Sequence, residues 1–345
     1  MSEPVDFSSI TEQIRKNNSE LTILEFSSKK LGEVGGAAVA CTLEMNTTLT
    51  VLDLSSNGLR DFGAMAILRS LMRNNTLTTL KLGHNNIRHG VGQHVQQMLL
   101  SNSTLMTLSL EGNFFISKGG TAIAGGLESN TTLTDLDLSF NYLGFLDYDI
   151  DDEDDSDGRR ILVYNDEEMR HLMAFAHMLE RNTTLKTLNL SGNELREVSG
   201  NAVAEALKRN PTLTKLNLKG NELGSSLDSF ASMLQENISL RTLILSKQYD
   251  GHEFTSYCDD FFDYLPKNST LTSLDLSHNK FGPNATYLYN IEICFKINTT
   301  LTSMDLSGNR LTDDILILLY GIMDSRESDE NELSGIKCAI ASRPR

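Results

Sequence analysis

The stretch LTVLDLSSN (Leu49–Asn57) decides the fold, because close copies of it recur along the chain. Its apolar and polar residues alternate, so Leu52 and Leu54 point to one side of a short strand while Val51 and Asp53 point to the other. A single strand of this kind cannot bury its leucines alone. The stretch therefore predicts a strand that needs neighbouring copies of itself.

The copies begin at a regular interval. Their first leucines are Leu21, Leu49, Leu77, Leu105, Leu133, Leu185, Leu213, Leu240, Leu271 and Leu301. The first four steps are 28 residues long, and the last four are 28, 27, 31 and 30. The step of 52 between them is one repeat with 24 inserted residues. Ten repeats stacked on one another are the expected architecture.

An asparagine closes most of these copies. The asparagines are Asn57, Asn85, Asn113, Asn141, Asn193, Asn221, Asn279 and Asn309. A buried amide here can bond backbone groups of the neighbouring turn, so we expect a ladder along the stack. The eighth repeat departs from the pattern and carries Gln248 instead.

The second half of each repeat is predicted to be helical. The segment GNAVAEALKRN (Gly200–Asn210) places Ala202, Val203, Ala206 and Leu207 on one stripe. An asparagine follows most helices, and we expect it to take the left-handed conformation that ends a helix. These asparagines are Asn46, Asn75, Asn102, Asn130, Asn182, Asn210, Asn237, Asn268 and Asn298.

The repeats resemble the ribonuclease-inhibitor-like subfamily of leucine-rich repeats, from residue 8 to about 323. The resemblance implies an α/β fold, a right-handed horseshoe-shaped solenoid with a parallel inner sheet and outer helices. Phrases such as NTTLT also resemble repeats of protist proteins and of effectors of intracellular bacteria. An effector would act in the host cytosol.

The repeat limits also define the expected domain organisation. Residues 1–20 form an N-terminal helical cap, and residues 21–323 form the solenoid, with an acidic insertion at about 145–168. Residues 324–345 form a polar C-terminal tail. End segments of this kind shield the core of a stacked protein.

Charge narrows the class of partner. The chain has 46 acidic and 30 basic residues, and its formal net charge is −16. Such a surface repels phosphate backbones, so nucleic acid is not expected as a partner. A folded protein with a basic patch is the expected complement, and the unbound chain is expected to be a monomer.

The cysteines and the N-terminus bear on localisation. Cys41, Cys258, Cys294 and Cys338 lie far apart without a CxxC pair, as expected of reduced thiols in a cytoplasmic protein. The first residues, MSEPVDFSSI, lack the basic and apolar regions of a signal peptide. The sequence contains no apolar run of membrane-spanning length, so no membrane association is expected.

The motifs of common enzymes are missing from the sequence. It contains no HExxH, GxxxxGK[ST] or GxSxG, so we expect neither catalysis nor a cofactor. Asp275 and Asp305 share one column of adjacent repeats and could be drawn as an acid pair, but a solvated acidic face explains them better. No metal site is expected either. The run DYDIDDEDDSDG (147–158) imitates the start of an EF-hand, but Tyr164 stands where the bidentate Glu belongs.

A catalytic alternative comes from a relative by fold. The Ran GTPase-activating protein shares this kind of repeat and contributes to catalysis in trans. Arg60, Arg88, Arg196 and Arg310 lie near strand ends here and could imitate that role. A GTPase-activating or other catalytic regulator is therefore the rival to pure binding.

Aromatic and acidic residues near strand ends are the candidate binding site. Phe114, Phe140 and Tyr142 follow the fourth and fifth strands, where most repeats carry Ser, Gly, Lys or Glu. Exposed aromatic clusters are common interface anchors, although these rings could instead cover the base of the insertion. The full candidate set is Phe114, Asp135, Asp137, Phe140, Tyr142, Phe145, Tyr148, Tyr249, Asp275 and Asp305.

These observations predict a leucine-rich-repeat protein that grips a folded partner with its concave face and the rim around the insertion. It would act as an inhibitor that occludes the partner or as a scaffold that recruits it. The insertion and the irregular eighth repeat follow the ends of strands, so both loops are expected on one edge, where repeat proteins add specificity.

Overall fold

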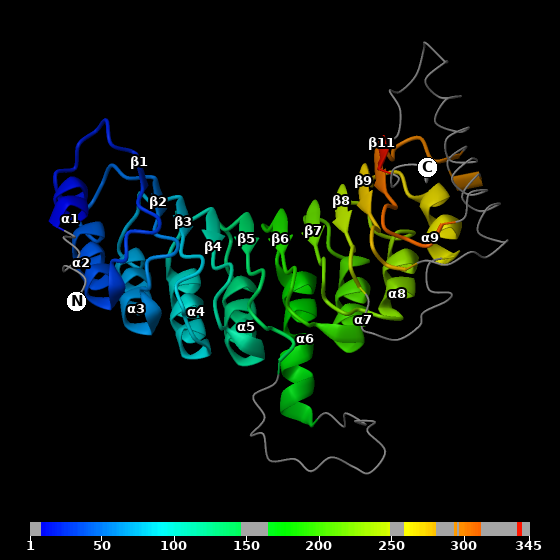
Figure 1. Cartoon of the computed structure of the whole chain (residues 1–345), viewed down its shortest axis with the longest axis horizontal. Helices are drawn as coiled ribbons and strands as arrows, with labels where there is room; N and C mark the ends of the chain where they lie inside the picture. The colour runs from blue at the N-terminus through cyan, green and yellow to red at the C-terminus, as the bar shows by residue number, and fades with distance from the viewer. Residues whose placement is uncertain are drawn as a thin grey trace. The chain divides into compact units, whose positions relative to one another are not determined.

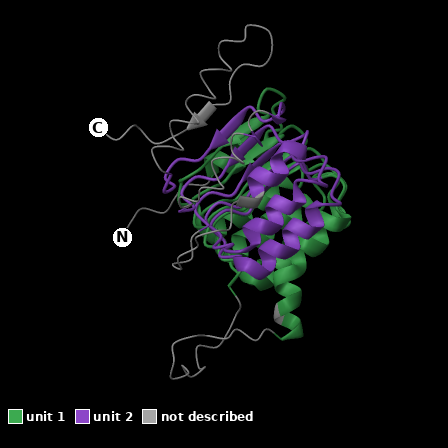
Figure 2. Ribbon diagram, turned by 90° about the vertical axis from the view of Figure 1, so that its right-hand side faces the viewer, with its two compact units in different colours: residues 1–184 green, residues 185–345 purple. Residues whose placement is uncertain are grey.

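The computed structural model describes residues 8–145, 165–248, 259–280, 293–294, 297–311 and 337–339. The chain divides into two compact units, residues 1–184 and residues 185–345 (Figure 2). Each unit alternates short strands with helices. In each, the strands line one side of the unit and the helices line the other (Figure 1).

Unit 1 holds the first five strands in chain order. The strands are β1 (Ile23–Glu25), β2 (Val51–Asp53), β3 (Thr79–Lys81), β4 (Thr107–Ser109) and β5 (Asp135–Asp137). The helices are α1 (Ser8–Arg15), α2 (Gly32–Leu43), α3 (Arg60–Leu71), η1 (His89–Val91), α4 (Gly92–Ser101), α5 (Ile116–Leu127) and α6 (Asp166–Arg181). The strands pair in parallel, and their register aligns one buried leucine per strand. These leucines are Leu24, Leu52, Leu80, Leu108 and Leu136.

Unit 2 continues the same alternation. The strands are β6 (Thr187–Asn189), β7 (Lys215–Asn217), β8 (Thr242–Ile244), β9 (Ser273–Asp275), β10 (Ser303–Asp305) and β11 (Lys337–Ala339). The named helices are α7 (Arg196–Leu207), α8 (Ser226–Met233), α9 (Asp259–Tyr264) and η2 (Leu265–Lys267). Its strands also pair in parallel in chain order.

The sequence-based prediction of an α/β solenoid with parallel strands is confirmed. The strands are short. For example, β6 contains Leu188 but ends at Asn189, so the next leucine of the pattern, Leu190, lies just beyond the strand. The pairing of β10 with β11 in the register Met304↔Cys338 was not foreseen, because the segment around Cys338 lacks the leucine pattern. It lies within the segment that we expected to be a polar tail.

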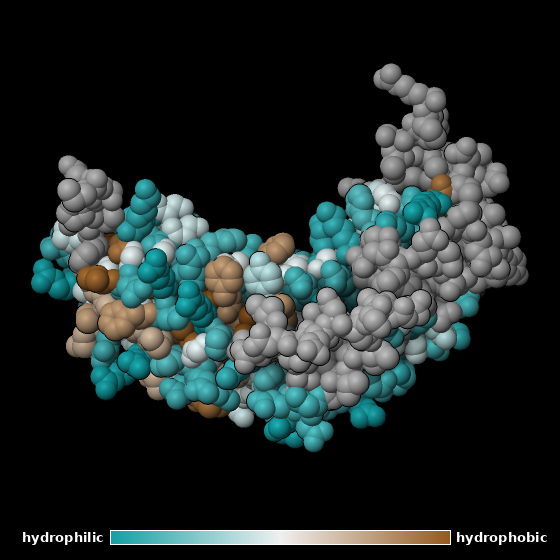
Figure 3. Space-filling view, turned by 60° about the horizontal axis from the view of Figure 1, so that its bottom comes forward, coloured by the Kyte–Doolittle hydropathy of each residue, from teal (hydrophilic) through white to brown (hydrophobic). Residues whose placement is uncertain are grey.

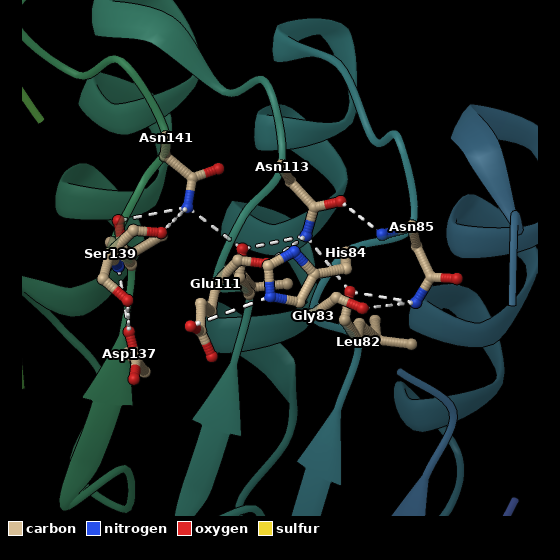
Figure 4. A network of polar contacts seen from close by, with 11 residues as sticks. Leu82, Gly83, His84, Asn85, Glu111, Asn113, Asp137, Ser139 and Asn141 are labelled. Carbon is tan, nitrogen blue, oxygen red and sulfur yellow. Dashed lines mark hydrogen bonds and ion pairs between the residues drawn. The ribbon is translucent and has the colours of Figure 1, made fainter. Parts of the chain in front are cut away.

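The expected asparagine ladder is present in unit 1 (Figure 4). The Asn85 Oδ1 accepts a hydrogen bond from the Asn57 amide at 2.9 Å, and the Asn113 Oδ1 accepts one from the Asn85 amide at 3.0 Å. The Asn85 Nδ2 donates to the carbonyl oxygens of Leu54 and Leu82, one repeat apart. The ladder thus satisfies backbone groups that the turns between strands and helices would otherwise leave buried and unpaired.

Gln248 keeps this ladder intact in unit 2. Its Oε1 accepts from the Asn221 amide at 3.2 Å, and its Nε2 donates to the Leu218 carbonyl at 2.7 Å. Its own amide donates to the Asn279 Oδ1 at 2.7 Å. The longer amide side chain takes the place of the asparagine, so the departure of the eighth repeat in sequence does not interrupt the stack.

The asparagines that follow the helices form a second ladder, and the left-handed conformation expected for them is wrong. The Asn102 backbone is extended, with φ −85° and ψ 129°, because its Oδ1 turns to accept the amides of Thr104 and Leu105. Its Nδ2 donates to the Leu71 carbonyl of the preceding repeat at 2.7 Å. In the second repeat this position belongs to the buried Asn74 rather than to Asn75.

Candidate functional site

The turns that follow the strands position the predicted aromatic residues. Each turn of unit 1 places residues in the left-handed backbone region, which favours glycine. In one turn these positions hold Ser56 (φ 58°) and Gly58 (φ 68°), whereas three repeats later they hold Phe140 (φ 55°) and Tyr142 (φ 57°). Bulky residues in this region cost about 1–2 kcal/mol each. The turn after β5 therefore carries two aromatic side chains that the backbone does not favour.

Four aromatic residues form an exposed group that we call the aromatic rim, namely Phe114, Phe140, Tyr142 and Phe145. The rings of Phe114 and Tyr142 stack, with centroids 6.0 Å apart and planes inclined by 4°. Both side chains remain 44% exposed, and that of Phe140 is 56% exposed. The structure thus brings Phe114 and Tyr142 together, as expected for adjacent repeats.

Backbone hydrogen bonds fix the loop that carries the rim. The Phe145 amide donates to the Tyr142 carbonyl at 2.9 Å, and the Ser117 amide at the start of α5 donates to the Phe145 carbonyl at 3.1 Å. The Phe114 amide donates to the Ile87 carbonyl at 2.7 Å. The rim is therefore attached to the helix and to the preceding turn, so its rings are presented on a defined backbone.

Asp135 and Asp137 lie on β5, next to this loop, and both are half-buried. The Asp137 Oδ1 accepts hydrogen bonds from the Ser139 amide at 2.9 Å and from the Ser139 hydroxyl at 2.6 Å. Asp135 accepts one from the Thr134 hydroxyl at 2.7 Å. Both carboxylates add negative charge beside the rim.

The third residue of the strands has a structural role that sequence reasoning missed. Asp275 and Asp305 each accept the amide two residues further on, at 2.9 Å, just as Asp137 does. Asn189 and Asn217 make the same bond at 3.1 Å. An aspartate in this column is therefore explained by the turn alone. The column pairs Asp275 with Asp305 across β9 and β10 in unit 2.

Two predicted site residues, Tyr148 and Tyr249, lie outside the described residues, as does the acidic run 147–158 with its calcium hypothesis. Among the residues that the structure does describe, no group of three or more His, Cys, Asp or Glu side chains could hold a metal ion. No helix within that part of the chain is long and apolar enough to cross a membrane.

Two pairs of oppositely charged residues lie on the strand side of unit 1. Lys81 lies 3.4 Å from Asp53, and the His84 Nε2 lies 3.7 Å from the Glu111 carboxylate (Figure 4). Unit 2 differs at β6 to β8. Five exposed cations lie there, and we call them the basic strand face: Lys186, Lys215, Lys219, Arg241 and Lys247. Only Lys215 and Lys219 stood out in the sequence, because the other three lie in different columns of the repeat.

A second exposed apolar group in unit 1 also escaped sequence reasoning. Figure 3 shows apolar atoms gathered over the first helices of the unit. The exposed residues there include Val34 on α2 and Phe62 on α3, which are 68% and 56% exposed. They are 28 residues apart and so occupy one column of the repeat. A column-by-column reading of the helices, rather than of the strands alone, would have found them.

Two of the arginines considered for catalysis in trans form exposed ion pairs. Arg60 lies 3.6 Å from Glu33, and Arg196 lies 4.0 Å from Glu222. Pairs of this exposure contribute little to stability.

Comparison with known proteins agrees with the repeat architecture. A family model described as Leucine Rich repeat matches residues 46–68, 73–88, 129–144, 181–202, 209–226, 267–285 and 298–319. No curated protein matches the chain significantly.

Two solved structures show a partial likeness. One is titled Leiomodin-1 Actin-Binding Site 2, with a TM-score of 0.37, 28% identity, and coverage of 39% of this chain and 79% of that chain. The other is the tropomodulin C-terminal domain of Caenorhabditis elegans, with a TM-score of 0.35, 11% identity, and coverage of 59% of this chain and 93% of that one. Both TM-scores are low, and neither likeness supports an inference about a partner. By its repeats and its strand pairing, the chain is an α/β leucine-rich-repeat solenoid.

Proposed function

We propose that the chain binds a folded protein partner through the aromatic rim and the adjoining strand side of unit 1. Leucine-rich repeats typically serve as protein-binding scaffolds, because their stacked strands offer an extended surface. The observation that carries the proposal is the exposure of the Phe140 and Tyr142 rings, 56% and 44%, at turn positions where other repeats hold small, polar or charged residues such as Ser56 and Glu222. Exposed rings at these positions are explained by a contact outside the chain better than by packing within it.

Charge defines the kind of partner. Asp135 and Asp137 lie beside the rim, and the chain as a whole carries a net charge of −16. A basic patch around an apolar centre is the complement of this surface, since opposite potentials accelerate encounter and exclude wrong partners. The chain would act as an inhibitor if the rim covers the partner's active site, or as a scaffold if it does not.

The test is a comparison of two variants. The rim variant, Phe140→Gly with Tyr142→Asn, replaces two of the four rim residues with residues that suit the left-handed backbone. Phe62→Ala removes a side chain on α3 that is as exposed as Phe140, at 56%. Wild type and both variants are used to capture proteins from the source cytosol, and affinity for the captured protein is then measured. The rim variant is expected to lose about thirtyfold in affinity, whereas Phe62→Ala is expected to bind normally.

Two outcomes would contradict the proposal. In one, the rim variant binds every captured protein as tightly as wild type does. In the other, it loses binding together with its cooperative thermal transition, which would make the rings packing residues. A GTP-hydrolysis assay with Ran, using Arg60→Ala and Arg196→Ala, addresses the catalytic alternative. We expect no stimulation by wild type and no change in the variants.

A further inference from the structure

The basic strand face in unit 2 is assembled from three neighbouring strands. Lys215 is the first residue of β7, and Lys186 and Arg241 immediately precede β6 and β8. Lys219 and Lys247 lie in the turns that follow β7 and β8. The parallel register places these strands side by side (Figure 1). Neighbouring strands lie about 4.8 Å apart, so the cations cover about 10 Å across the sheet.

These cations are exposed, and none of the five forms an ion pair with an acidic residue of the described chain. The third residues of the same strands, Asn189, Asn217 and Ile244, are neutral. Glu222, the acidic residue of the turn after β7, lies 4.0 Å from Arg196. A chain of net charge −16 thus carries a local surface of positive potential.

The fold does not require these cations. In most repeats a threonine precedes the strand and donates its hydroxyl hydrogen to the carbonyl of the preceding repeat, as Thr214 does to Lys186 and Thr272 does to Arg241. Lys186 and Arg241 stand in this same column and have no hydroxyl for that bond. Like charges close together on neighbouring strands also repel one another. Both observations indicate that the cations serve a contact with another molecule.

We propose that the basic strand face binds a short, extended, acidic segment of a protein partner. The distance along the strand from Lys215 to Lys219 is about 13 Å, which about four residues of extended chain span. Carboxylates on such a segment can reach cations on successive strands, so that recognition depends on a run of acidic residues. This site is distinct from the aromatic rim and goes beyond the proposed function.

A nucleic acid fits the same surface less well. The net charge of −16 repels those parts of a long polyanion that extend past the patch along the acidic surface. The five cations and the third residues of β6 to β8 include no aromatic side chain, so these described residues offer no platform on which bases stack. Four of the five cations are lysines, which present point charges to carboxylates.

The test uses the full chain and labelled probes. The probe is a peptide of about ten residues with a central run of glutamates, long enough to cross the face. A peptide with glutamines in the same places and an oligothymidine of similar length are the comparison ligands. Binding is followed by fluorescence anisotropy at low and at physiological salt. The wild-type chain is expected to bind the glutamate peptide, more weakly at higher salt, and to bind the other two ligands more weakly still.

Matched variants locate the site. Lys215→Glu with Lys219→Glu is compared with Lys118→Glu with Lys267→Glu, which changes the net charge equally at exposed positions elsewhere. The first pair is expected to lower the affinity for the glutamate peptide by more than about tenfold, and the second by less than about twofold. Lys215→Arg with Lys219→Arg is expected to retain binding, and so is the rim variant.

Three results would overturn the inference. In the first, the glutamate peptide fails to bind wild type at low salt. In the second, the two charge-reversal pairs weaken binding equally. In the third, oligothymidine binds as tightly as the glutamate peptide does. Thermal unfolding of each variant confirms that the fold is retained. Because the rim variant is assayed with the same peptide, failure here is distinguishable from failure of the proposed function.

Discussion

The strand sides of the two units share one repeat and carry different chemistry. In unit 1 the turn after β5 presents Phe140 and Tyr142 next to Asp137, whereas in unit 2 the strands β6 to β8 present cations such as Lys215. The buried leucines and the asparagine ladder are the same in both. The comparison shows that the repeat fixes the inward residues and, apart from the third strand residue that bonds the turn, lets the outward ones differ between the units.

The largest expected effect concerns what the two units share. Asn113→Ala in unit 1 and Asn221→Ala in unit 2 each remove a buried ladder amide, leaving backbone groups such as the Asn85 and Asn193 amides without their acceptor. Each substitution is expected to lower the free energy of unfolding by about 2–4 kcal/mol, measured by chemical denaturation. A loss below about 0.5 kcal/mol in either unit would show that water replaces the ladder there.

A smaller effect is expected where a side chain covers a turn glycine. The His84 ring lies where a Cβ on Gly112 would be, while a Cβ on Gly58 would meet nothing within 4 Å. Both glycines have positive φ, 64° and 68°, so alanine is strained at either position. Gly112→Ala is expected to cost about 1 kcal/mol more than Gly58→Ala in thermal unfolding, because the ring must leave Glu111.

His278 covers Gly308 of unit 2 in the same way. In unit 1, removing the ring with His84→Ala should make the cost of Gly112→Ala in thermal unfolding equal to that of Gly58→Ala. If Gly112→Ala and Gly58→Ala lower the stability equally when His84 is present, the histidine ring moves aside without cost.

The aromatic rim lies in unit 1 and distinguishes its strand side from that of unit 2. Phe140→Gly alone is expected to leave the free energy of unfolding unchanged or to raise it by up to about 1 kcal/mol, since glycine suits φ 55° and the ring is 56% exposed. Thermal unfolding measures this, with Ser56→Gly at the equivalent turn position as the control. A drop of more than about 1 kcal/mol would mean that the ring packs within the chain.

The smallest effect is expected from the acidic insertion. Replacing residues 151–155 with Ser and Gly removes five acidic side chains and should slow association with a basic partner about twofold to tenfold at low salt. Dissociation should change much less, which stopped-flow or surface-binding kinetics can separate. Equal association rates for both proteins at low salt would show that the insertion does not steer the encounter.

The sequence by itself determined the repeat, the parallel α/β architecture and the position of the ladder, because a leucine such as Leu52 has to be buried and an amide such as Asn85 has to be paired. These are local demands that recur every 28 residues or so, and periodicity reveals them. The periodicity also predicted that Phe114 and Tyr142 lie in neighbouring turns, where their rings stack.

Only the tertiary structure decided how the remaining residues are used. Gln248 reaches the same backbone groups as an asparagine, and the Asn102 side chain binds the Leu71 carbonyl of the preceding repeat. Lys186 and Lys247 lie 61 positions apart in sequence, yet strand pairing gathers them on one face with Lys215. Each of these outcomes depends on a contact between repeats, and the sequence of one repeat does not contain the neighbour that makes it.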